Sequence, residues 1–169
     1  MKDTINAINK LKENGLINDY AIGGAIAVLK WTEPFFTRDL DIFIIHEAKE
    51  KERVILTPIY EYLKERGAQW EKQWIIVNGI PVDFIVADKL ETEAIENAEE
   101  VEYEEVKTKI LTPEYLIALF IRAGRDKDER KIEMLLKQTK IDMEKLEKIL
   151  NENELIEKFV KFKEKYYGK

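Results

Sequence analysis

Hydrophobic and polar residues follow one another along the first 110 residues in patterns that predict alternating helices and strands. Ile5, Ile8 and Leu11 recur at helical spacing, whereas 38–45 is a short run rich in Ile and Phe, which is typical of a strand. The patterns predict helices at 4–14, 25–31, 50–66 and 89–100 and strands at 19–22, 38–45 and 101–111.

One hairpin has a strong local signal. Asn78-Gly79 stands between two runs of β-branched residues, and this pair favours a two-residue turn. Such a turn sets Val77 opposite Ile80. It also puts the side chain of Asp83 on one face of its strand while the residues on either side of it face the core.

The remainder of the chain shows only helical spacing. Thr112-Pro113 is typical of a helix start, with Thr112 as the cap, and Asp142 is predicted to cap a later helix. The predicted helices are 113–123, 127–138, 142–151 and 153–166. The expected fold is therefore α/β (α+β): a small mixed sheet flanked by helices, then a C-terminal helical bundle. We divide it into a core at 1–110 and a helical region at 111–169 packed on that core.

Composition removes several classes of function. The sequence has no cysteine and no serine, which excludes disulfides, thiolate metal sites and both nucleophiles. It lacks an apolar run long enough for a membrane span and a signal-peptide core, so we expect a cytoplasmic protein with no membrane partner. Its 37% of charged residues, mostly Lys and Glu, is typical of a thermophile.

Charge is unevenly distributed. Residues 1–106 hold 22 acidic and 12 basic residues, whereas 107–140 hold 5 acidic and 9 basic ones. The segment 158–169 is also rich in lysine. An acidic sheet beside a basic helical region could hold a metal on one side and phosphates on the other.

Two aspartates interrupt an apolar run. On a strand, Asp39 and Asp41 share one face, and Asp83 is a third carboxylate in an apolar strand. Carboxylates that converge repel one another, and a divalent cation such as Mg²⁺ relieves the repulsion. The alternative is structural, because a lone Asp-x-Asp is a weak motif: Asp39 would pair with Arg38 or a lysine, and Asp83 would be an exposed edge residue.

A glycine pair precedes these aspartates. At a strand-to-helix turn, Gly23 and Gly24 let backbone N–H groups approach a phosphate, although a purely structural turn is an equal alternative. Gly23-Gly24, fourteen intervening residues and Asp39-Leu40-Asp41 resemble the signature of the DNA polymerase β-like nucleotidyltransferase superfamily. Residues 18–138 resemble most closely the AbiEii-like group, in the two stretches GGAIAVLKWTEPFFTRDLDIFI and TPEYLIALFIRAGRDKDERKIEMLL.

The resemblance implies transfer of NMP from a nucleoside triphosphate (NTP) to an acceptor. It implies a site of two Mg²⁺ ions held by Asp39, Asp41 and Asp83, with Asp83 as base or second-metal ligand. Gly23 and Gly24 would hold the triphosphate.

Further residues are candidates for nucleotide binding. Arg122 and Arg125 would be neighbours if one helix ran through Gly124, and arginine forks match phosphate oxygens. Lys127-Asp128 matches a Lys-Asp pair that recurs in AbiEii-like proteins. Thr37 and Arg38 complete the set, whereas His46 is read as incidental. For the residues of 122–128 the alternative is a solvated, salt-bridged helix junction.

The acceptor is not visible in the sequence. AbiEii-like relatives act as toxins or phage-defence enzymes, often on tRNA ends, so RNA or tRNA is the first choice, with a cognate antitoxin or toxin as partner. An antitoxin-type enzyme that adenylylates a partner protein is an alternative, as is an aminoglycoside-modifying relative. A catalytically inactive nucleotide-binding or interaction module is the rival from another class.

Overall fold

The computed structural model describes residues 1–168 and contains one sheet and eight helices. The chain divides into two compact units: residues 1–27 with 35–111, and residues 28–34 with the chain from Thr112 onward. The helices are α1 Lys2–Glu13, α2 Gly24–Trp31, α3 Glu52–Glu65, α4 Lys89–Glu96, α5 Pro113–Ala123, α6 Asp126–Gln138, α7 Met143–Glu152 and α8 Ile156–Tyr167. The strands are β1 Asp19–Gly23, β2 Leu40–Ile45, β3 Gln69–Glu71, β4 Trp74–Val77, β5 Ile80–Val86, β6 Glu99–Tyr103 and β7 Val106–Ile110.

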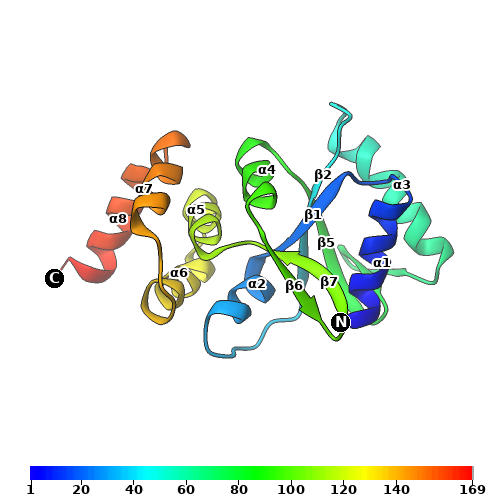
Figure 1. Ribbon diagram of the computed structural model, residues 1–169, viewed down its shortest axis with the longest axis horizontal. Coiled ribbons are helices and arrows are strands. Elements are labelled where there is room, and N and C mark those ends of the chain that lie inside the picture. Colours follow the sequence, from blue (N-terminus) through cyan, green and yellow to red (C-terminus); the bar gives the residue numbers. More distant parts are fainter. Residues whose placement is uncertain (169) are drawn as a thin grey trace. The chain divides into compact units, whose positions relative to one another are not determined.

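The first unit is built on a mixed sheet with the strand order β3-β4-β5-β2-β1-β7-β6 (Figure 1). Strand β2 lies near its centre, antiparallel to β1 and parallel to β5. Helices α1, α3 and α4 contact strands of this sheet. The predicted fold class, a mixed sheet flanked by helices and followed by further helices, is confirmed.

Burial alternates along β2, so that one face of the strand is in the core and the other carries Asp41. Leu40, Ile42 and Ile44 are fully buried, whereas Asp41 and Phe43 between them are half-buried. Successive residues of a strand point to opposite faces, so one face of β2 belongs entirely to the core. Asp41 is on the other face.

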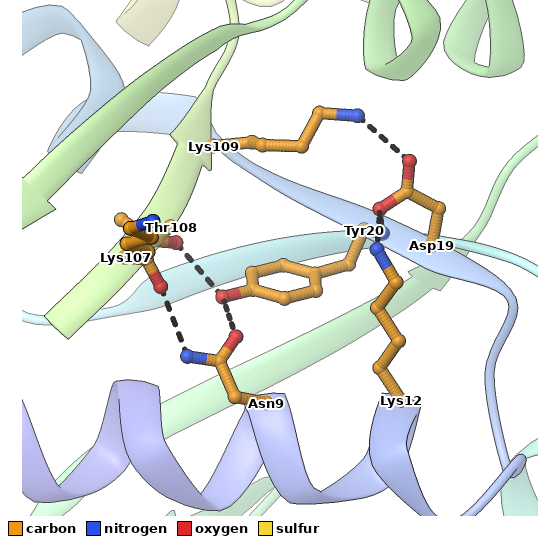
Figure 2. Close-up of polar contacts among 7 residues, drawn as sticks. All are labelled: Asn9, Lys12, Asp19, Tyr20, Lys107, Thr108 and Lys109. Carbon is orange, nitrogen blue, oxygen red and sulfur yellow. Dashed lines mark hydrogen bonds and ion pairs between the residues drawn. The ribbon is translucent and has the colours of Figure 1, made fainter.

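Helix α1 is attached to the sheet by polar contacts around the buried Tyr20 of β1 (Figure 2). The Tyr20 hydroxyl donates to Asn9 Oδ1 at 2.7 Å and lies 2.9 Å from Thr108 Oγ1 in β7. Asn9 also donates to the backbone carbonyl of Lys107. The Tyr20 hydroxyl therefore has hydrogen-bond partners on two elements, which offset the cost of removing it from water.

The described sheet has three hairpins, β3–β4, β4–β5 and β6–β7, and the last two test the turn predictions. Asn78-Gly79 has positive φ at both positions, and Val77 pairs with Ile80 as predicted. The β6–β7 hairpin was not predicted: helix α4 ends at Glu96 rather than at 100, and the single strand expected at 101–111 is two strands. Glu104 and Glu105 connect them, with φ of 46° and 70°.

The second unit is helical, and its predicted helix starts are largely correct. Pro113 occupies the first turn of α5, and Asp142 caps α7 by accepting from the Lys145 backbone N–H. Thr112 stands at the cap position of α5, but its side chain makes no capping bond, and its buried Oγ1 has no partner among the described residues. None of the helices within residues 1–168 combines the length and apolar character that crossing a bilayer requires.

Candidate active site

Asp41 lies where three strands of the first unit meet in register. It pairs across the sheet with Gly23 of β1 on one side and with Asp83 of β5 on the other. Paired residues on neighbouring strands share a face and have backbones about 4.8 Å apart. The Asp41 and Asp83 side chains therefore leave the same face of the sheet side by side.

Gly24 leaves room for the Asp41 carboxylate. It has a φ of +58°, and a Cβ added there would lie 1.8 Å from Asp41 Oδ2. The carboxylate thus occupies the space beside the first residue of α2, where the helix dipole favours negative charge. The neighbouring Gly23 is required for another reason, because a Cβ there would lie 2.3 Å from the Phe43 ring.

Asp83 is exposed, while Val82 and Phe84 beside it are only 2% exposed. Asp83 therefore lies on the face of β5 opposite the core, as predicted. Its pKa is raised above the ordinary value of 3.8. The first cause is partial removal of its carboxyl from water, and the next are the negative charges of Asp39 and Glu52. The carboxyl group of Asp83 is thus in an acidic neighbourhood.

Asp39 corrects one detail of the prediction. Strand β2 begins at Leu40, so Asp39 lies in the irregular segment before it and does not share a strand with Asp41. It is half-buried, and its charge acts on Asp83. Strand β1 ends at Gly23, opposite Asp41, so no residue of β1 lies opposite Asp39.

The metal site predicted from the sequence is not preformed. Within residues 1–168, no three carboxylate or imidazole side chains come close enough together to hold a metal ion. The chemistry of the donors nevertheless fits magnesium, because Asp41 and Asp83 are in register and Asp39 adds a third hard oxygen donor nearby.

The basic candidates within 122–128 belong to the second unit. Gly124 adopts the left-handed conformation and ends α5, so the condition under which Arg122 and Arg125 would be neighbours on one helix is not met. Arg125 precedes α6, and its Nε donates to Asp128 at 2.6 Å. Lys131 donates to the other oxygen of Asp128 at 2.9 Å, and Asp128 is only 1% exposed. The junction is salt-bridged at these residues.

The remaining nucleotide-binding candidates lie in both units. Thr37 is half-buried and Arg38 exposed, both between α2 and β2, while Lys127 is exposed in the first turn of α6. Arg122 is half-buried in the last turn of α5.

Comparison with known families shows to which family the chain belongs. Residues 1–167 match the model of a family described as "Nucleotidyl transferase of unknown function (DUF2204)". The chain belongs to this family. It is a nucleotidyltransferase, and its family implies an NTP substrate and an acceptor. No curated protein sequence matches it.

Two solved structures share the fold of this nucleotidyltransferase. An antigenic nucleotidyltransferase-like protein from Paracoccidioides brasiliensis is 17% identical with a TM-score of 0.56, and the match covers 79% of this chain and 72% of that one. The structure of ANT(2")-Ia in complex with adenylyl-2"-tobramycin is 15% identical with a TM-score of 0.50, over 86% of this chain and 91% of that one.

Sequence reasoning missed two residues of α3 in this nucleotidyltransferase. Glu52 is one of the charges that raise the pKa of Asp83. The second residue is Tyr60, whose pKa is raised first by burial and then by the negative charge of Asp83. The centroid of its ring lies 6.2 Å from that of Phe84, in an edge-on arrangement. The relation depends on packing between α3 and β5, which no local pattern reveals.

Proposed function

We propose that this nucleotidyltransferase is magnesium-dependent and that it moves NMP from an NTP to an acceptor hydroxyl at Asp39, Asp41 and Asp83. The observation that carries the proposal is the register of β2 and β5, which aligns Asp41 with Asp83 beside the start of α2. Asp39 is the third carboxylate of the proposed site, because its negative charge acts on Asp83.

These three residues would hold two Mg²⁺ ions. When bound, Mg²⁺ neutralises triphosphate charge and makes an acceptor hydroxyl more acidic. Asp41 would anchor the site, since Gly24 gives its carboxylate a fixed place. Asp83 would act as the base or as the second-metal ligand; its raised pKa is that of the metal-free protein and would fall when Mg²⁺ binds.

The reaction would proceed by direct displacement. The acceptor oxygen forms a bond to the α-phosphorus, its proton passes to Asp83, and the bond from the α-phosphorus to the bridging oxygen breaks. Pyrophosphate leaves with that bond's electron pair, and the acceptor carries NMP. The nucleotide-binding role of Gly23, Gly24, Thr37, Arg38, Arg122, Arg125 and Lys127 belongs to the same proposal and comes from the resemblance. Asp128 is left out of it, because it is 1% exposed and both of its oxygens accept from Arg125 and Lys131.

RNA, and tRNA in particular, is the acceptor that we propose, in a toxin or phage-defence setting as the likeness to AbiEii-like proteins suggests. The basic composition of 107–140 and 158–169 supports an RNA partner, because lysine and arginine bind phosphates. An adenylylated partner protein and an aminoglycoside of the tobramycin type are the competing acceptors, the latter because of the ANT(2")-Ia structure.

One experiment separates these acceptors. The protein is incubated with each of the four α-labelled NTPs and Mg²⁺, and with total RNA, with lysate protein or with tobramycin. We expect label on RNA, none after chelation of Mg²⁺, and none with Asp41→Asn, while Asp3→Asn, an exposed aspartate of α1, serves as the matched control. Label on protein or on tobramycin would replace the acceptor, and no label on any acceptor would contradict catalysis.

A further inference from the structure

Phe36 is the most exposed large hydrophobic side chain within residues 1–168, at 86%. It lies in the irregular segment between α2 and β2, whereas Phe35 before it is half-buried. A single exposed phenylalanine with polar Thr37 and exposed Arg38 after it is too small for a protein interface, which needs about 800 Å² on each partner.

The position of Phe36 relative to the carboxylates is limited by the chain itself. Asp39 follows three residues later, and three residues span at most about 10 Å. Leu40 comes next, is fully buried and begins β2, so this end of the segment is fixed to the sheet. The aromatic ring is therefore tethered within one nucleotide's length of the proposed metal ligands.

We infer that Phe36 stacks on the base of the NTP bound at Asp39, Asp41 and Asp83. The inference rests on the proposed function, in which the carboxylates engage only the triphosphate end and leave the base to other surfaces. Every base has a π-face, so a single aromatic ring can hold any of them, and Arg38 next to it adds a cation. Phe36 would thus contribute affinity without selecting one base strongly.

Calorimetry with Mg²⁺ tests the stacking on the full chain. The ligands are ATP, CTP, GTP and UTP, together with inorganic tripolyphosphate, which has the phosphates and no base. The variants are Phe36→Ala, Phe36→Tyr and the matched control Tyr103→Ala, which removes a 43% exposed aromatic residue from β6. Thermal melting checks that each variant folds.

We expect Phe36→Ala to weaken binding of all four NTPs by about 5- to 100-fold, which is the range for a lost base–aromatic stack. Tripolyphosphate should bind the variant as it binds the unaltered protein, and Phe36→Tyr should restore NTP affinity. Normal NTP binding by Phe36→Ala, or an equal loss for tripolyphosphate, overturns the stacking role alone. Absence of NTP binding by the unaltered protein overturns the proposed function as well.

Discussion

Two aspartates at different places in the same sheet have opposite electrostatic surroundings. Asp19 of β1 accepts hydrogen bonds from Lys109 at 2.7 Å and Lys12 at 3.1 Å (Figure 2). Partial burial alone would raise its pKa, but these bonds and one from the Tyr20 backbone hold that pKa below 3.8. Asp83 has acidic neighbours, and its pKa moves the other way.

Asp128 in the second unit resembles Asp19 rather than Asp83. It is buried, and each of its oxygens accepts from a basic side chain, Arg125 or Lys131. A carboxylate that serves the fold is thus matched by a cation from the chain. We propose that the acidity around Asp83 is instead neutralised by Mg²⁺ that binds with the NTP.

The strongest test of this contrast is to neutralise the carboxylates beside Asp83. Asp39→Asn or Asp41→Asn should lower NMP transfer by more than about 100-fold, because each removes a proposed metal ligand. Labelled NTP transfer measures the loss. Thermal melting of Asp39→Asn in the absence of Mg²⁺ should show no destabilisation, since the charge that repels Asp83 is removed. Turnover at the unaltered rate by either variant would rule out the two-aspartate site.

Asp83→Asn should separate binding from chemistry. We expect it to retain most NTP affinity, because Asp39 and Asp41 still hold the metal of the nucleotide, and to lose most of the transfer rate, because the proton acceptor is gone. Single-turnover transfer and calorimetry measure the two quantities. Near-normal transfer would leave a site of two carboxylates.

Asp128→Asn should act on stability. Removing the charge leaves two basic side chains without their partner, one of them largely buried, at a cost of about 1–3 kcal/mol in the free energy of unfolding. Urea denaturation measures it, with the exposed pair Lys10–Glu13 as the matched comparison, where Glu13→Gln should leave the free energy of unfolding almost unchanged. Equal effects at the two sites would contradict the distinction between a buried and an exposed pair.

The smallest expected effect is a pH dependence of opposite sign. Because the pKa of Asp19 is lowered in the folded protein, Asp19 stabilises the fold at pH values above 3.8, and this stabilisation is lost as the pH falls through the folded-state pKa. Because the pKa of Asp83 is raised, its stabilising contribution is present at pH values below 3.8 and is lost as the pH rises through the folded-state pKa. Near neutral pH, Asp19→Asn should therefore be less stable than the unaltered protein and Asp83→Asn slightly more stable.

Urea titrations of both variants at several values between about pH 3 and pH 7 measure these differences. Both should shrink toward acid, where each aspartate is protonated and resembles asparagine. A difference of the same sign for the two variants would show that their surroundings are alike.

The β4–β5 hairpin and the alternation of β2 could be predicted because their causes are local. Asn78-Gly79 accepts positive φ at low cost, so the turn fixes the register and with it the face of Asp83. The turn between β6 and β7 uses Glu104-Glu105, which carries no such preference. The pairing of β6 with β7 imposes that conformation, and no pattern of four or five residues reveals it.

The candidate site divides in the same way. The carboxylates stood out because aspartates in apolar runs are costly. The predicted helices 113–123 and 127–138 already left Gly124 between them, whereas Asp39 lies just before its strand because β1, the partner of β2, ends opposite Asp41. Glu52 and Tyr60 reach Asp83 through long-range packing and left no sign in the sequence.

The missing Cβ at Gly24 also limits which substitutions related chains can carry. While Asp41 keeps its carboxylate, a side chain at position 24 would collide with it and would have to adopt a positive φ. Without that carboxylate only the positive φ would restrict position 24, and asparagine tolerates positive φ. If Asp41 is the metal ligand that we propose, a relative with a side chain at position 24 is expected to have lost nucleotidyl transfer.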